Sequence, residues 1–83
     1  MKQKRLNRPS VYLVTFWNAD GSKEVKRESY PMHIFSFEQV VEKLKGKETE
    51  CDIYESRYYK KRSQYITNGR TFVWDGNNWV VLP

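Results

Sequence analysis

The residues best suited to contact a ligand lie close together, in residues 57–65 of the 83-residue chain. Four cations and three tyrosines occur there without any carboxylate: Arg57, Tyr58, Tyr59, Lys60, Lys61, Arg62 and Tyr65. Cationic side chains can neutralise phosphates, and aromatic rings can stack on bases. The segment therefore predicts a surface that binds DNA or RNA.

Two other interpretations of residues 57–65 stay open. Tyrosine and arginine are favoured at the centres of protein–protein interfaces, so the segment could instead bind a larger protein partner. In the third interpretation the segment has no binding role: the tyrosines lie half in the core, and the cations are solvent-exposed side chains at the tip of a hairpin.

A second concentration of positive charge lies in residues 1–9, which contain Lys2, Lys4, Arg5 and Arg8 and no acid. The formal net charge is +5. Residues 1–9 and 57–62 together hold eight of the fifteen cations, and the remainder of the chain is net acidic. We expect a flexible basic arm over residues 1–9, whose Lys4, Arg5 and Arg8 add to the contact with nucleic acid.

The chain is poor in the residues that catalysis or metal binding would need. It has one histidine, His33, and one cysteine, Cys51, whereas a zinc site needs about four ligands. The acidic residues before the basic segment are expected to form a solvated face; they are Glu48, Glu50, Asp52 and Glu55. All four glycines suit turns or helix ends, so no phosphate-binding loop is indicated. We expect a non-enzymatic protein with no catalytic residues, no metal and no cofactor.

Length and composition indicate one small domain over residues 10–83. A single cysteine cannot form an internal disulfide, which is typical of a reducing cytoplasm. No apolar run reaches the length of a membrane span, so we expect a cytoplasmic protein without membrane contact, as a monomer or homodimer.

The hydrophobic pattern predicts an α+β fold with the element order ββαββββ. Strands are expected at residues 11–17, 23–30, 51–59, 63–67, 70–74 and 79–82, and a helix at residues 37–45. Successive tight turns favour an antiparallel sheet of about five or six strands, with the helix packed on one face. A small, partly closed β-barrel with one helix is the alternative.

Two local signals define the expected core. Ser36 and Gln39 have capping-box spacing, and Phe37, Val40, Val41 and Leu44 form one apolar stripe. Asn68–Gly69 is a strong hairpin signal between residues 63–67 and 70–74. In a two-residue turn, Tyr65 would face Phe72, and an aliphatic side formed by Ile66 and Val73 would meet the helix.

Residues 71–80 resemble the short aromatic hairpins of many phage-encoded and bacterial β-rich proteins. The resemblance covers about ten residues and implies neither a function nor site residues. Small size and the lack of catalytic residues are typical of accessory proteins of phages and mobile elements. The leading hypothesis is a small non-enzymatic module that binds nucleic acid, and the alternative is an inhibitor or regulator that binds a larger enzyme.

Overall fold

The computed structural model describes residues 10–59, 64–66 and 69–82. Its elements are β1 (Val11–Trp17), β2 (Glu24–Pro31), α1 (Phe37–Lys43), a short 3-10 helix η1 (Glu48–Glu50), β3 (Cys51–Tyr59), β4 (Gln64–Ile66), β5 (Thr71–Trp74) and β6 (Trp79–Val81). The predicted α+β class and the order ββαββββ are confirmed. The predicted arm over residues 1–9 lies outside the described residues.

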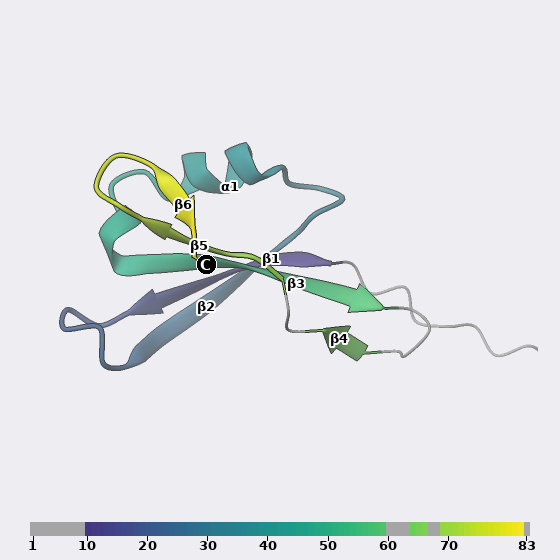
Figure 1. Cartoon of the computed structure of the whole chain (residues 1–83), viewed down its shortest axis with the longest axis horizontal. Coiled ribbons are helices and arrows are strands. Elements are labelled where there is room, and N and C mark those ends of the chain that lie inside the picture. The colour runs from purple at the N-terminus through teal and green to yellow at the C-terminus, as the bar shows by residue number, and fades with distance from the viewer. Residues whose placement is uncertain (1–9, 60–63, 67–68, 83) are drawn as a thin grey trace, which may run out of the picture.

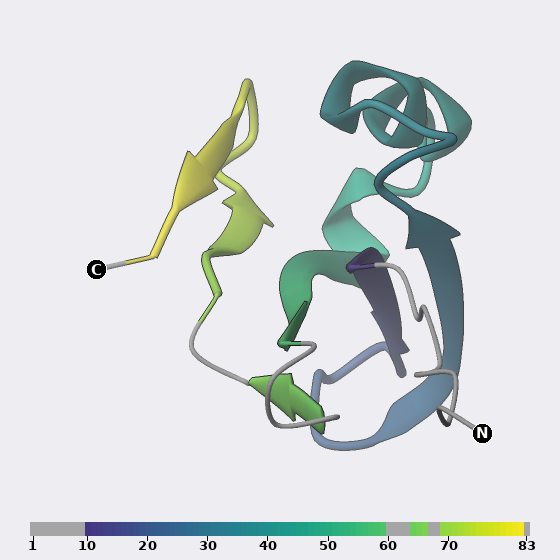
Figure 2. The same ribbon diagram turned by 90° about the vertical axis from the view of Figure 1, so that its right-hand side faces the viewer.

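The strands form one antiparallel sheet in the order β2-β1-β3-β5-β6, and β4 also pairs with β3. The sheet is open, with β2 and β6 at its edges, so the alternative of a partly closed barrel is wrong (Figures 1 and 2). The strongly charged strand β2 (Glu24–Pro31) is at an edge, where charged side chains discourage pairing with other chains.

The β1–β2 hairpin turns at residues 18–22. Gly21 has φ of 76°, a left-handed conformation that glycine adopts at no steric cost. Its backbone N–H donates to the Asn18 carbonyl at 2.9 Å, and the Asn18 side chain accepts from the backbone N–H of Ser22. The hairpin is thus fixed by its own local hydrogen bonds, and β1 is left free to pair with β3 on its other side.

Helix α1 begins at the predicted cap. The Ser36 hydroxyl accepts from the Gln39 backbone N–H at 3.2 Å, and the Gln39 side chain accepts from the Ser36 N–H at 2.8 Å. The helix ends at Lys43 with Leu44 as its C-cap, slightly earlier than the predicted end at residue 45. The apolar stripe of the helix faces the sheet, where Val40 and Leu44 are buried.

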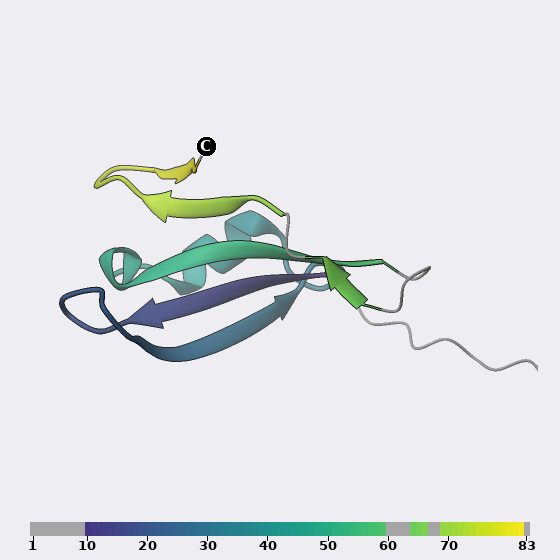
Figure 3. The same cartoon turned by 60° about the horizontal axis from the view of Figure 1, so that its bottom comes forward.

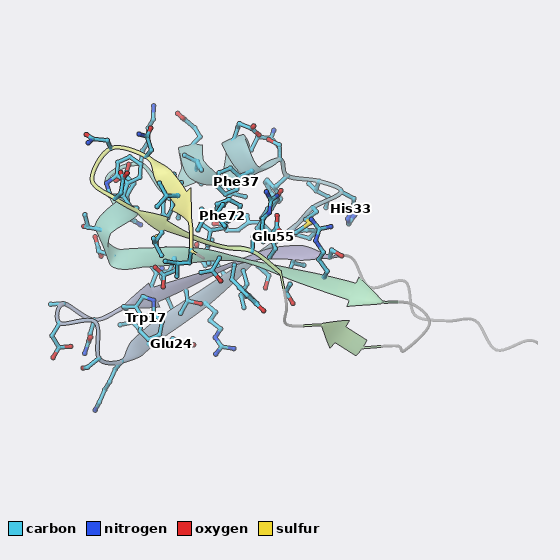
Figure 4. All side chains as sticks on the ribbon, in the orientation of Figure 1. Trp17, Glu24, His33, Phe37, Glu55 and Phe72 are labelled. Atoms are coloured by element: carbon cyan, nitrogen blue, oxygen red, sulfur yellow. The ribbon has the colours of Figure 1, made fainter. Side chains whose placement is uncertain are left out.

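The core lies between α1 and one face of the sheet. Val14, Ile53, Phe72, Val40 and Leu44 are among its buried residues. The Phe37 ring of the helix lies 4.4 Å from the Phe72 ring of β5, measured between ring centroids. In Figure 4 these two rings lie on the same side of the sheet, opposite to Trp17 and Glu24.

The predicted hairpin between residues 63–67 and 70–74 is wrong. In the part of the chain that the structure describes, β4 pairs with β3, and β5 pairs with β3 and β6, so Tyr65 does not face Phe72. Phe72, expected on a side away from the helix, packs against it, whereas Val73 lies on the other side of the sheet. The long strand β3 offers one continuous edge to both β4 and β5, and pairing with that edge prevails over the local turn signal.

Gly69 comes just before β5, where the chain runs against the β3 backbone. A Cβ atom at this position would lie 2.8 Å from both the carbonyl carbon and the Cβ of Glu55. The Glu55 N–H also donates to the Arg70 carbonyl at 2.8 Å. Glycine is therefore needed here for close approach of two backbones, and not for the two-residue turn that Asn68–Gly69 predicted.

The β5–β6 hairpin turns through Asp75, whose carboxylate accepts from the backbone N–H groups of Asn77 and Asn78. Trp74 and Trp79 are cross-strand partners with their ring centroids 5.6 Å apart. These two tryptophans thus pack against each other across the two strands of the hairpin.

The sheet face away from α1 carries no other described element (Figure 3). Leu13 and Tyr54 are cross-strand partners on this face, and Trp17 lies on the same side of β1. All three are only partly buried. Within the described residues, no helix is both long and apolar enough to cross a membrane.

Candidate nucleic-acid interface

The predicted basic segment is built around a two-stranded antiparallel ribbon. Residues 57–59 at the end of β3 pair with residues 64–66 of β4, with Tyr58 opposite Tyr65. Strand β4 and the C-terminal end of β3 extend along the sheet beyond α1, to the right in Figure 1. Residues 60–63 lie between β3 and β4 in the sequence, outside the described residues, and include three of the four cations of residues 57–62.

Most predicted contact residues lie outside the described residues: Lys4, Arg5, Arg8, Lys60, Lys61 and Arg62. Tyr58, Tyr59 and Tyr65 are described through their strand pairing. Of the predicted set, Arg57 is the residue whose side-chain contacts the structure describes.

Arg57 pairs with a buried carboxylate. Its Nη2 lies 3.5 Å from Oε1 of Glu55, and its side chain remains 49% exposed. Residues 57–65 contain no carboxylate, but Glu55 lies two positions earlier and therefore on the same face of β3. Arg57 is thus a half-exposed cation with a fixed acidic neighbour.

Arg70 is the residue that sequence reasoning missed. Its Nη2 donates to Glu55 Oε2 at 2.8 Å, and its Nε donates to Oε1 at 3.2 Å. Its backbone N–H also donates to Oε1, and its guanidinium lies over the Phe72 ring at 5.2 Å from the centroid. One signal was available in the sequence: Glu55 continues the alternation of Cys51 and Ile53, which places it on the buried face of the strand.

Glu55 is 2% exposed, so its charge depends on these donors. The hydrogen bonds from the Arg70 side chain are the main cause that holds the pKa of the Glu55 carboxyl below its ordinary value. The same bond raises the pKa of Arg70. Glu55 is therefore ionised at neutral pH, and the three side chains of Arg57, Glu55 and Arg70 carry a net charge of about +1. We call this group the Glu55 cluster.

Cys51 and His33 are not brought together. Cys51 pairs with Phe16 at one end of β1, whereas His33 follows Pro31, which pairs with Val11 at the other end. Burial raises the pKa of the Cys51 thiol to about 11, and its Sγ contacts the Lys47 carbonyl oxygen at 3.4 Å. A protonated, buried thiol is a poor nucleophile.

The four acidic residues predicted to form one solvated face point to different partners. Glu48 accepts from the backbone N–H of Gly46, Asp52 accepts from the Trp17 indole at 3.0 Å, and Glu55 is buried. The prediction of a solvated face is thus wrong for Glu55. Among the described residues, no group of three or more acidic, histidine or cysteine side chains could hold a metal ion.

No protein family, curated protein or solved structure matches this chain. Its function is therefore inferred from the arrangement of its own residues.

Proposed function

We propose that this protein is a non-enzymatic module that binds nucleic acid through the β3–β4 ribbon, with the basic residues of the N-terminal arm adding contacts. The observation that carries the proposal is the antiparallel pairing of residues 57–59 with residues 64–66. It supports the proposal because the two ends of the predicted segment form a two-stranded ribbon, and Lys60, Lys61 and Arg62 lie between these ends in the sequence.

A two-stranded ribbon has the width to enter the major groove of a DNA duplex. Along a single strand, the same cations can follow the phosphates while tyrosines stack on bases. In both cases phosphate contacts supply most of the affinity, because each neutralised phosphate releases a condensed counterion. The ribbon can therefore bind DNA or RNA, and the binding assay described next distinguishes them.

The uncovered sheet face is less suited to a polyanion. Its cation Arg27 pairs with Glu24 at 2.7 Å, and its Asp52 adds negative charge beside Trp17. The ribbon is preferred because its connection is basic and contains no acid.

Fluorescence anisotropy with labelled DNA duplex, single-stranded DNA and RNA at several salt concentrations tests the proposal. We expect binding that weakens steeply with salt. Neutralising Lys60, Lys61 and Arg62 to Gln should reduce the slope of log affinity against log salt by about 2 to 3, since each phosphate contact contributes roughly 0.7 to 0.9.

The matched control is the neutralisation of Lys43, Lys45 and Lys47 to Gln, which removes the same charge from exposed positions at the end of α1 and in the loop after it. Equal losses in both triple variants would show that net charge alone acts, and would contradict a ribbon site. Folded protein that retains none of the three nucleic acids at low salt would overturn the proposal.

A second candidate is a protein-binding role. In this role the protein would be an accessory protein of a phage or mobile element that inhibits or regulates a larger enzyme. The observation in its favour is the uncovered sheet face, where Leu13, Trp17, Tyr54 and Val73 are partly exposed and Val80 is 38% exposed. A Tyr54→Lys variant should abolish capture of such a partner, whereas the Gln variant of the ribbon connection should not. For either role we propose a reducing cytoplasm, because the single cysteine is buried and cannot form an internal disulfide.

A further inference from the structure

We propose that Arg57 and Arg70, held in place by Glu55, form a binding site for one phosphate group at the base of the ribbon. This inference rests on the proposed function, since the phosphate is taken to be part of the nucleic-acid backbone. It adds Arg70, which is far from the basic segment in sequence, and it makes Glu55 a positioning residue.

The charge balance of the Glu55 cluster differs from the other ion pairs of the described residues. Glu24 pairs with Arg27, Glu28 with Lys26, and Glu42 with Lys45, so each of these carboxylates meets one cation. Glu55 meets two guanidinium groups. One positive charge is left uncompensated beside a water-excluded carboxylate, and an anion can neutralise it.

The geometry leaves donors for that anion. A guanidinium has five N–H groups, and Glu55 takes up the Nε–H and one Nη–H of the Arg70 side chain. The Arg70 side chain is 60% exposed and that of Arg57 is 49% exposed, so both heads reach solvent. The Arg70 guanidinium, oriented by Glu55, and the Arg57 guanidinium beside it suit the tetrahedral oxygens of phosphate, which arginine contacts through paired hydrogen bonds.

Glu55 and Phe72 restrict the motion of Arg70. The carboxylate holds two of its side-chain nitrogens, and the Phe72 ring lies beneath the guanidinium. Figure 4 shows Glu55 and Phe72 on the helix side of the sheet. A guanidinium held in this way loses little conformational entropy when it binds an anion.

A purely structural ion pair is the competing explanation, and it differs in what it predicts. A buried ion pair seldom stabilises a fold more than well-packed apolar residues would. It also needs no second arginine. If the pair is only structural, phosphate should not shift the NMR signal of Arg57. The proposed site requires phosphate to shift the signals of both Arg57 and Arg70.

The first test follows the arginine Nε–Hε resonances by NMR during titration with inorganic phosphate and with dimethyl phosphate, against sodium chloride at equal ionic strength. We expect saturable shifts of the Arg57 and Arg70 signals with both phosphates and not with chloride. Arg27 is the internal control, since Glu24 neutralises it at 2.7 Å. Shifts of equal size at all three arginines, or none at Arg57 and Arg70, would overturn the site.

The second test measures nucleic-acid affinity at fixed salt for Arg57→Lys and Arg70→Lys, with Arg27→Lys as the control. Lysine keeps the charge but loses the fork. Each of the first two variants should weaken binding about fivefold, the loss expected for one hydrogen bond. Arg57→Lys is decisive if Arg70→Lys fails to fold, because Arg57 makes the longer contact with Glu55.

The two tests separate the site from the proposed function. Phosphate shifts at Arg57 and Arg70 without retention of nucleic acid would support a site for free phosphate and refute the proposed function. Retention of nucleic acid with unchanged affinity in Arg57→Lys would refute the site and leave the ribbon proposal standing.

Discussion

Replacing Glu55 with Gln tests how much the Glu55 cluster contributes to stability. Gln keeps the shape of the side chain and one oxygen, which can still accept from Arg70 Nε and from the Arg70 backbone N–H. The other oxygen becomes an NH₂ group, which meets the Arg70 Nη2 donor to donor. The substitution therefore removes the shortest bond of the cluster, at 2.8 Å, together with the negative charge.

The expected loss of stability in Glu55→Gln depends on the burial of Glu55 and the exposure of its partner Arg70. Losing a charge-assisted hydrogen bond costs roughly 1.5–3 kcal/mol. Glu55 is 2% exposed, but the Arg70 side chain is 60% exposed, so water replaces part of the lost interaction. We expect the free energy of unfolding to fall by about 2 kcal/mol at pH 7, which corresponds to a decrease in melting temperature of about 8–16 °C for a domain of this size.

The dependence on pH identifies the charge as the cause. Arg70 holds the pKa of Glu55 below its ordinary value of 4.5, so the folded state favours the ionised form. A depressed pKa stabilises the fold above the unfolded-state value, and that contribution is lost as pH falls through the folded-state value. The difference in unfolding free energy between wild type and Glu55→Gln should be constant from pH 7 to about 5. Below pH 4.5 it should shrink by up to about 1.4 kcal/mol per pH unit.

Urea unfolding followed by tryptophan fluorescence measures these free energies. The control is Glu24→Gln, which breaks the exposed Arg27–Glu24 pair and should cost at most about 0.5 kcal/mol. A loss as small in Glu55→Gln as in the control would refute the reasoning. So would a difference from wild type that stays unchanged from pH 7 down to pH 2.

Three further predictions concern the fold. Gly69→Ala should lower the free energy of unfolding by about 2 kcal/mol, because the added Cβ meets the Glu55 backbone; an unchanged urea midpoint would contradict this close approach. Ser36→Ala should lower the free energy of unfolding by about 1 kcal/mol in the same assay, because the helix loses its cap. Ser36→Asp should retain most of the stability of the wild type, because Asp also caps helices. Equal losses of stability in the two variants would exclude the cap as the cause. Burial raises the pKa of the Cys51 thiol to about 11, so Cys51 should react slowly with a disulfide reagent at pH 8 and rapidly in denaturant. A fast reaction of the folded protein would show that the thiol is accessible and would contradict this prediction.

The elements predicted correctly are those fixed by local residues. The helix has its cap at Ser36 and its apolar stripe within one short segment, so nearest neighbours determine it. The strand over residues 51–59 alternates clearly between buried and partly buried positions at its start, and its bounds match the prediction. These features need no knowledge of where the rest of the chain lies.

The errors arise where distant segments compete for the same backbone. Asn68–Gly69 predicts a local hairpin, but β5 forms its ladder with β3 instead, through Phe72 opposite Ile53 and Thr71 opposite Tyr54. The Glu55–Arg70 pair spans fifteen residues and exists only because of this ladder. No local pattern at Arg70 identifies it as the partner of a buried carboxylate, so the sequence showed the cations of residues 57–62 and missed the one across the sheet.

The strand β3 links the core to the candidate site. Ile53, Glu55 and Arg57 lie on the same face of β3. Along this face the strand passes from a fully buried apolar side chain to a buried carboxylate and then to a half-exposed cation. β1 and β5 pair with the first part of this strand, and β4 pairs with its end. A site carried by a strand that is anchored in the core is more rigid than one carried by a loop, and rigidity lowers the entropy lost on binding. In the site that we propose, Glu55 therefore lies where the core ends and the ribbon begins, and it pairs there with both Arg57 and Arg70.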